Sequence, residues 1–181
     1  MFKLFASESN NETFPPVFLF NSESREEEEF QPLSKKGVRM YSCGPTVYDY
    51  AHIGNLRAYV FADTLKRALV YNGYQVNHTI NYTDFGHLTS DADTGEDKTM
   101  KGLKREGLDI SLESMRALSD RFIAAFETDI EALNILPPSQ FARASEYVKE
   151  QITLIKTLDE KGYLYQTSDG VYFDTSKFPT Y

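Results

Sequence analysis

The sequence predicts an α/β fold built on a parallel β-sheet. Residues 38–42 and 75–81 have the composition of strands, and residues 56–72 between them have helical periodicity. Two strands joined through a helix form a βαβ unit, in which the strands run parallel. Of the 181 residues, 41% are hydrophobic, so the chain can bury a core around a Rossmann-like sheet.

The region ahead of this unit gives weaker signals. Residues 1–16 are predicted to be a flexible tail, because residues 6–13 are polar and show no periodicity. A short strand is predicted at Phe18–Phe20. The four consecutive acids of Glu26–Glu29 are interpreted as a solvated turn.

The predicted helix at 56–72 carries an apolar stripe at helical spacing, formed by Ala58, Ala62, Leu65 and Leu69. Gly73 stands where a left-handed C-cap is expected. Residues 84–107 are rich in Asp, Gly, Thr and Lys. They predict a long loop with a short helix near residues 98–105.

An α-helical continuation and a terminal β-hairpin are predicted after residue 107. Apolar residues recur every three or four positions from Leu112 to Leu133, and two prolines then end the helix. Ser139 is the predicted cap of a second helix, whose stripe reaches Leu158. Strand-like runs around a turn at 168–170 predict the hairpin.

Composition and charge exclude several classes of protein. The net charge is −8, which should repel a nucleic acid backbone unless a local basic patch exists. No apolar run approaches the length of a membrane span, and no secretory signal is evident. A single cysteine excludes an internal disulfide and fits the reducing cytoplasm. We therefore expect a cytoplasmic protein without a membrane partner.

The most informative stretch is Cys43–Asn55, between the first strong strand and its helix. In a parallel sheet this junction lies at the carboxyl end of a strand, where ligands bind. The backbone N–H groups and the dipole of a helix start favour phosphate there, and Gly54 allows close backbone approach. Thr46 and Thr83 follow neighbouring strands and are expected to reach one crevice.

Each of these residues also has a structural interpretation. A lone cysteine such as Cys43 is usually a small buried hydrophobe, and a histidine such as His52 at a helix start is often a cap or a surface residue. Thr46 and Thr83 could be ordinary polar residues at strand ends. His78 lies within a strand and is predicted to be structural or surface.

Two other features are weaker candidates. The spacing of Asp91, Asp93, Gly95 and Asp97 resembles half of a calcium-binding loop, but Gly is misplaced and Gly102 stands where Glu is required. An acidic surface loop is the favoured interpretation. His87 follows Asp84 closely and could approach the site.

The same stretch resembles the start of a cysteinyl-tRNA synthetase, a class I aminoacyl-tRNA synthetase. The HIGH signature of that class maps to His52–Asn55. The resemblance covers roughly residues 18–181. Its matching motifs are Cys43–Asp49, His52–Asn55, Asn81–Asp84, Ala132–Leu136 and Lys161–Tyr163.

The resemblance implies ATP-dependent activation of cysteine to cysteinyl-adenylate, followed by transfer to tRNA(Cys), with Mg²⁺ accompanying ATP. It assigns catalysis to His52 and Asn55, and ATP binding to His52, Gly54 and Asn55. It places Gly44, Thr46 and Thr83 in the cysteine pocket. It makes Cys43 a ligand of Zn²⁺, whose other ligands are expected beyond residue 181. Zinc would favour the soft thiolate of cysteine over the hydroxyl of serine.

The resemblance also has departures. Asn55 replaces the second His of the signature; it can donate a hydrogen bond but carries no charge. The KMSKS signature and the anticodon-binding helices do not occur in these 181 residues. We therefore expect an N-terminal portion of a longer enzyme that is inactive alone. Residues 17–107 would be half of the catalytic domain, and residues 108–181 a helical continuation entering the connective insertion.

Two alternatives remain from the sequence. One is a related ligase that couples cysteine to an amino sugar, although its Cys-Gly signature continues differently from Pro45-Thr46-Val47. The other is a non-catalytic module that binds a nucleotide or a protein.

Overall fold

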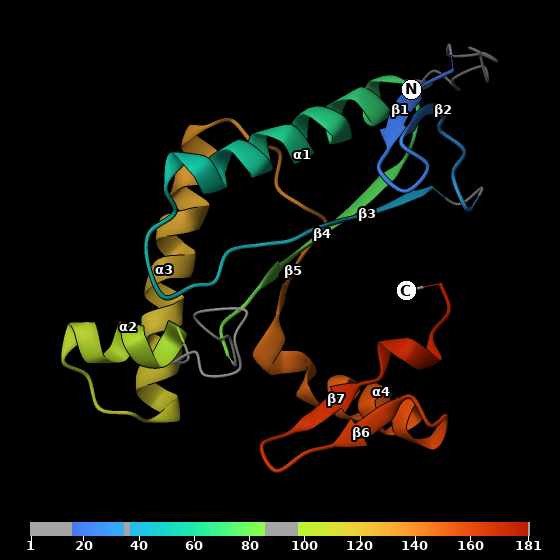
Figure 1. Cartoon of the computed structure of the whole chain (residues 1–181). Helices are drawn as coiled ribbons and strands as arrows, with labels where there is room; N and C mark the ends of the chain where they lie inside the picture. The colour runs from blue at the N-terminus through green and yellow to red at the C-terminus, as the bar shows by residue number, and fades with distance from the viewer. Residues whose placement is uncertain (1–15, 35–36, 86–97, 181) are drawn as a thin grey trace, which may run out of the picture. The chain divides into compact units, whose positions relative to one another are not determined.

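The computed structural model describes residues 16–34, 37–85 and 98–180 (Figure 1). The chain divides into two compact units. The first unit comprises Met1–Cys43, Ala51–Ile80 and Glu127–Gln140, and the second comprises Gly44–Tyr50, Asn81–Phe126 and Phe141–Tyr181. None of the helices formed by the described residues has the length and apolar character needed to cross a bilayer.

The first unit begins with an antiparallel hairpin of β1 (Phe18–Asn21) and β2 (Glu26–Glu29). The strand at Phe18–Phe20 is confirmed, but the prediction of a turn at Glu26–Glu29 was wrong. The turn lies between β1 and β2, where the Arg25 backbone N–H donates to the Asn21 carbonyl at 2.7 Å. The four acids are exposed, so their backbone can pair with β1 while their charges remain solvated.

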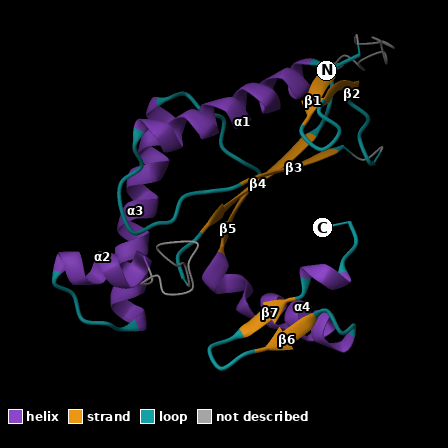
Figure 2. Ribbon diagram, viewed as in Figure 1, coloured by secondary structure: helices purple, strands orange, loops and turns teal. Residues whose placement is uncertain are grey.

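The predicted βαβ unit is confirmed. It consists of β3 (Val38–Ser42), α1 (Ile53–Tyr71) and β4 (Val76–Tyr82), shown as strands and helices in Figure 2. β3 and β4 pair in parallel over five residues, from Val38 opposite Val76 to Ser42 opposite Ile80. The sheet order is β3-β4-β5, with β5 at Gln140–Arg143. Gly73 has a positive φ of 81°, as its position after the helix predicted.

The buried face of α1 differs from the predicted stripe. Ala62 and Leu69 are buried, but Ala58 is exposed and Leu65 is only half-buried. The buried face instead includes Tyr59 and two charged residues, Asp63 and Lys66. These two charges can be buried because they have backbone partners in the turn after α3, the Leu136 N–H for Asp63 and the Pro137 carbonyl for Lys66.

The second unit contains α2 (Lys98–Glu106) and most of α3 (Leu112–Ala132), and both helices were predicted. Its core is apolar, and the buried side chains include Val47, Tyr82, Leu103, Leu118, Phe122 and Phe126. The ring of Tyr82 stacks on Phe141 at 4.8 Å and meets Phe126 edge-on at 6.0 Å. His87 and the acidic pattern at 91–97 lie outside the described residues.

The prediction of Ser139 as a helix cap was wrong. The Ser139 N–H donates to the His78 carbonyl at 2.8 Å, and its hydroxyl accepts from the His78 N–H at 3.1 Å. Ser139 therefore joins the backbone pairing of β4, and the chain continues as β5. Helical structure begins only with η1 (Ala144–Tyr147) and α4 (Val148–Glu160).

The predicted hairpin is confirmed as β6 (Leu164–Gln166) paired antiparallel with β7 (Val171–Phe173), followed by η2 (Thr175–Lys177). Figure 1 shows this hairpin beside α4. Its turn is fixed by Asp169, which accepts from the Thr167 hydroxyl at 2.6 Å and the Tyr172 hydroxyl at 3.0 Å. The domain boundaries at residues 17, 107 and 108 stay a prediction.

Candidate functional site

His52 is the N-cap residue of α1. Its Nδ1 atom accepts a hydrogen bond from the Gly54 N–H at 3.1 Å, and Asn55 Oδ1 accepts from the His52 N–H at 3.2 Å. Together the two side chains form a reciprocal capping box, a role usually filled by Ser or Thr with Glu or Gln. The cap interpretation of His52 is therefore confirmed, and Asn55 is its partner.

The capping box determines which polar atoms of these side chains stay available. Because Nδ1 accepts, a neutral His52 ring carries its proton on Nε2, which is then a donor. Asn55 uses Oδ1 in the cap, so its Nδ2 group keeps its two N–H donors. Both residues are exposed at the positive end of the α1 dipole. The cap thus orients two donors without consuming them.

Gly54 has a steric role that the sequence did not predict. A Cβ atom at this position would lie 2.9 Å from His52 Cε1 and 3.0 Å from His52 Nδ1. Any side chain there would push the imidazole out of its capping position. The expected role of Gly54, close approach to a ligand, remains a prediction, whereas its role in placing His52 follows from the geometry.

Cys43 directly follows β3 and is exposed, so it is not the buried hydrophobe that its composition alone favoured. Burial raises the pKa of the Tyr59 hydroxyl on α1, and the nearby Cys43 raises it further. Among the described residues, no group of three His, Cys, Asp or Glu side chains is arranged to hold a metal ion. Cys43 supplies one of the roughly four donors that zinc requires, so the described residues do not complete a zinc site.

In the second unit, Gly44, Thr46 and Thr83 come together around Asn81. The Gly44 N–H donates to Asn81 Oδ1 at 2.8 Å, and Asn81 Nδ2 donates to Thr83 Oγ1 at 3.1 Å. Thr46 and Thr83 form a parallel β-bridge. In this bridge the Val47 N–H donates to the Thr83 carbonyl at 3.2 Å, and the Thr83 N–H donates to the Pro45 carbonyl at 3.0 Å.

This arrangement explains why Thr46 and Thr83 meet. Sequence reasoning placed Asn81 in a matching motif but gave its side chain no role, because an Asn at a strand end gives no signal of its partners. Its side chain links the loop to the strand, because it accepts from the Gly44 N–H and donates to the Thr83 hydroxyl. Thr83 Oγ1 accepts from Asn81, so its hydroxyl proton remains able to donate elsewhere.

The end of β4 carries a second polar anchor. Asp84 is buried and accepts from the Ser145 N–H at 2.9 Å and from the Ser145 hydroxyl at 2.6 Å. Both carboxylate oxygens are therefore satisfied within the protein. Asp84 thus has a structural partner that accounts for its burial.

Comparisons with solved structures define the class of fold. A putative arginyl-tRNA synthetase from Campylobacter jejuni superposes with a TM-score of 0.55 over 81% of this chain and 39% of that chain, at 15% identity. The LeuRS of Agrobacterium radiobacter, solved in a ternary complex with tRNA and LeuAMS, also reaches 0.55, over 75% of this chain and 16% of that chain, at 23% identity. The fold is thus shared with tRNA synthetases.

Residues 29–181 match the family model of the tRNA synthetases class I (C) catalytic domain, and the chain belongs to this family. Among curated relatives, the cysteine–tRNA ligase 1 of Burkholderia lata is 52% identical over 166 residues, or 92% of this chain and 34% of that protein. The cysteine–tRNA ligase of Zymomonas mobilis is 44% identical over 92% of this chain and 31% of its own length. The chain thus spans about a third of these relatives.

Proposed function

We propose that the protein containing this chain is a cysteine–tRNA ligase. The observation that carries the proposal is the 52% identity to a cysteine–tRNA ligase across 92% of the chain. Neither alternative from the sequence, an amino-sugar ligase or a non-catalytic module, gains support from the relatives described above. A cytoplasmic location and partnership with tRNA(Cys) belong to the same proposal.

The proposed reaction has two steps. The carboxylate of cysteine attacks the α-phosphorus of ATP, which forms cysteinyl-adenylate and releases pyrophosphate. A ribose hydroxyl at the end of the tRNA then attacks the cysteinyl carbonyl and releases AMP. ATP enters with Mg²⁺, which neutralises part of the phosphate charge.

His52 and Asn55 are the proposed catalytic donors of the first step, and Gly54 completes the proposed ATP-binding turn. Negative charge builds on the phosphate oxygens as the carboxylate attacks, so donors fixed in advance stabilise the transition state more than the ground state. The Nε2–H of His52 and the Nδ2 group of Asn55 suit this role. The capping box supports the proposal because it fixes both side chains before ATP arrives.

Gly44, Thr46 and Thr83 are the proposed cysteine-binding residues. Gly44 and Thr83 are hydrogen-bonded through Asn81, and Thr46 pairs with Thr83 in a β-bridge, so backbone and hydroxyl groups are held together at the end of β4. Cys43 is the proposed zinc ligand of this chain, since its exposed thiol suits a soft metal. When bound, zinc would favour the thiolate of the substrate over a serine hydroxyl.

The test separates the catalytic role of His52 from its capping role. In the protein containing this chain, we expect His52→Ala to slow cysteine-dependent ATP–pyrophosphate exchange by about 10²–10³-fold. His52→Ser is the matched control, because Ser is a good N-cap but lacks a donor in the position of Nε2. It should restore helix stability and leave the rate low. Asn55→His should be tolerated, because it restores the common signature.

A His52→Ser variant that reacts at the wild-type rate would reduce His52 to a cap. Absence of cysteine-dependent exchange in the wild-type protein would contradict the proposed function itself. Metal analysis after gel filtration, with Cys43→Ser as the comparison, tests the zinc proposal separately: bound zinc should be lost in the variant.

A further inference from the structure

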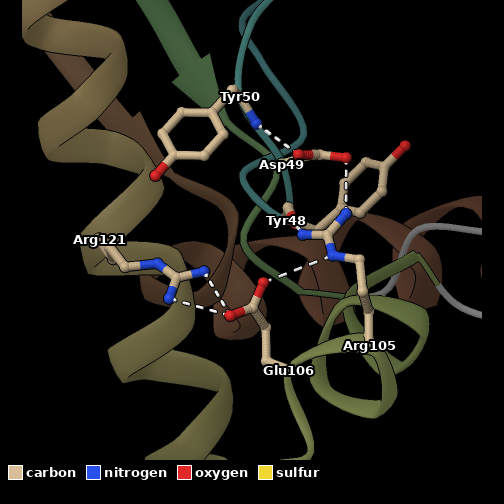
Figure 3. A network of polar contacts seen from close by, with 6 residues as sticks. All are labelled: Tyr48, Asp49, Tyr50, Arg105, Glu106 and Arg121. Atoms are coloured by element: carbon tan, nitrogen blue, oxygen red, sulfur yellow. Dashed lines mark hydrogen bonds and ion pairs between the residues drawn. The ribbon is translucent and has the colours of Figure 1, made fainter.

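The loop Gly44–Tyr50 is fastened to α2 by one arginine. Arg105 Nη1 pairs with Asp49 Oδ2 at 2.6 Å, and Arg105 Nη2 donates to the Tyr48 carbonyl at 2.8 Å (Figure 3). A planar guanidinium that contacts a side chain and the adjacent backbone fixes orientation as well as distance. Asp49 is itself held, since its Oδ1 accepts from the Tyr50 N–H at 2.8 Å.

Arg105 is in turn held by a second layer of contacts. Glu106 Oε1 lies 3.4 Å from Arg105 Nε, and Glu106 Oε2 accepts from the guanidinium of Arg121 at 3.1 Å. Arg121 lies over the ring of Phe122 at 4.6 Å, and this ring meets Tyr50 edge-on at 5.1 Å. The series of contacts thus begins at Tyr48 and Asp49 and returns to the loop at Tyr50. Figure 3 shows its polar part.

The backbone of α2 also approaches the loop closely. A Cβ atom added at Gly102 would lie 3.3 Å from both the Cβ and the carbonyl oxygen of Tyr48, and 2.9 Å from a methyl group of Leu118. Gly102 is buried, and Leu118 belongs to the core of the second unit. The absence of a side chain at Gly102 therefore lets α2 reach Tyr48, one turn before Arg105.

We propose that Arg105 is a positioning residue for the cysteine site, an inference that rests on the proposed function. One end of the loop carries Gly44 and Thr46, which are tied to Asn81 and Thr83. The other end carries Tyr48 and Asp49, which belong to the family-like motif but have no role in the proposed chemistry. Arg105 gives them one: it fixes the far end of the seven-residue loop that presents Gly44 and Thr46.

An ordinary surface ion pair is the competing interpretation. The side chains of Arg105 and Asp49 are 41% and 48% exposed, so their pairing adds little to global stability. The second bond of Arg105, to the Tyr48 carbonyl, favours the positioning role, because it holds the backbone of the loop as well as the Asp49 side chain. The effect must therefore be measured at the loop and at the cysteine site.

The first measurement is hydrogen exchange of the Gly44, Val47 and Thr83 amides in this chain. We expect Arg105→Ala to speed their exchange by about tenfold, the combined effect of losing an exposed ion pair and one hydrogen bond. Asp49→Asn keeps the shape of the side chain and should give a smaller increase. Arg105→Lys should preserve only part of the protection of these amides, since an ammonium group lacks the planar fork of donors. Arg116→Ala, an exposed arginine on α3 outside these contacts, is the matched control.

The second measurement is pyrophosphate exchange by the protein containing this chain. We expect Arg105→Ala to raise the KM for cysteine about tenfold while the KM for ATP stays within about twofold. The reason is that the loop carries Gly44 and Thr46, which are proposed to bind the substrate cysteine, and none of the proposed ATP-binding residues. Unchanged amide exchange, or an unchanged KM for cysteine, would overturn the proposal while the wild-type activity still stands. A wild-type protein without cysteine-dependent exchange would overturn the proposed function and this inference together.

Discussion

Helix α1, which presents His52 and Asn55, and the loop Gly44–Tyr50, which presents Gly44 and Thr46, are anchored in opposite ways. The anchors of α1 are buried charges: Asp63 is 9% exposed and Lys66 is 8% exposed. The anchors of the loop, Arg105 and Asp49, are nearly half exposed. Both anchors combine a charge with backbone groups, and they differ chiefly in their access to water.

The contacts of α1 show what the buried anchor does. Asp63 Oδ1 accepts from the Leu136 N–H at 2.9 Å, and Lys66 Nζ donates to the Pro137 carbonyl at 2.7 Å. Asp63 Oδ2 accepts from Arg67 Nε at 2.7 Å, and the same guanidinium also donates to the Asn134 carbonyl. These contacts fasten α1 to the turn that follows α3.

The difference teaches where each anchor should have its effect. A buried polar group that loses its partner carries a desolvation cost, whereas an exposed one turns to water. The anchor of α1 should therefore control whether the first unit folds. The anchor of the loop should control local order with little effect on global stability.

The largest effect is expected for Asp63→Ala. The substitution removes the acceptor of the Leu136 N–H and of Arg67 Nε, and with it the negative charge near the buried ammonium group of Lys66. Arg67 and Lys66 then keep only their backbone carbonyl partners. We expect it to lower the free energy of unfolding by about 2–3 kcal/mol. Urea denaturation of this chain measures it, and Asp63→Asn, which can still accept from Leu136, should lose about half as much. A loss as small as that of Asp49→Ala would remove the contrast between the two anchors.

The next effect sharpens the comparison within the second unit. Gly102→Val places a branched side chain against Tyr48 and Leu118, and overpacking of this kind costs about 1–3 kcal/mol. Lys101→Val changes the exposed neighbouring residue. Its free energy of unfolding should stay within about 0.5 kcal/mol of the wild-type value, a difference due to helix propensity alone. Chemical denaturation of both variants is the measurement. An equally stable Gly102→Val variant would show that α2 can move away from the loop without cost.

The sequence predicted the elements far better than their anchors. The βαβ unit, α2, α3 and the terminal hairpin follow from local periodicity and turn residues, which act over a few positions. The polar partners lie far apart instead: 73 residues separate Asp63 from Leu136, and 56 separate Arg105 from Asp49. No local pattern encodes such pairings. The stripe predicted for α1 therefore placed Ala58 in the core and left out Asp63 and Lys66.

Polar residues with two possible partners were the other source of error. Ser139 can cap a helix or join a sheet, and a partner 61 residues away decided between them. His52 was open to both a capping and a catalytic interpretation, and the structure makes it a cap that retains a donor. Glu26–Glu29 pairs through its backbone, for which side-chain charge gives no signal.

A smaller effect concerns pH and the first unit. His78 is 2% exposed, and burial, followed by the nearby Lys66, holds its pKa below the ordinary value; Asp63 acts in the opposite direction. Below pH of about 6.5 the unfolded chain therefore binds a proton that the folded chain does not, so stability should fall as the pH decreases. The slope for one such group is at most about 1.4 kcal/mol per pH unit.

Urea denaturation between pH 6.5 and 5.5 measures this loss, which for one such group is at most about 1 kcal/mol. His78→Gln is the control, since the amide cannot titrate but can still bond Ser42, whose Oγ lies 2.9 Å from His78 Nε2. Its stability should depend less on pH over this range, whatever its starting value. Parallel pH profiles of the two proteins would assign the slope to other groups.

The smallest effect on stability is expected at the anchor of the loop. Arg105→Ala removes an ion pair between side chains that are 41% and 48% exposed, and such pairs contribute about 0.2–1 kcal/mol. We expect the variant to unfold within about 1 kcal/mol of the wild type, and a double-mutant cycle with Asp49→Ala to give a coupling of about 0.5 kcal/mol. The physical reason is that both charged groups regain water when the pair is broken. A global loss as large as that of Asp63→Ala would place Arg105 among the residues that fold the second unit, and the exposed anchor would then act as the buried one does.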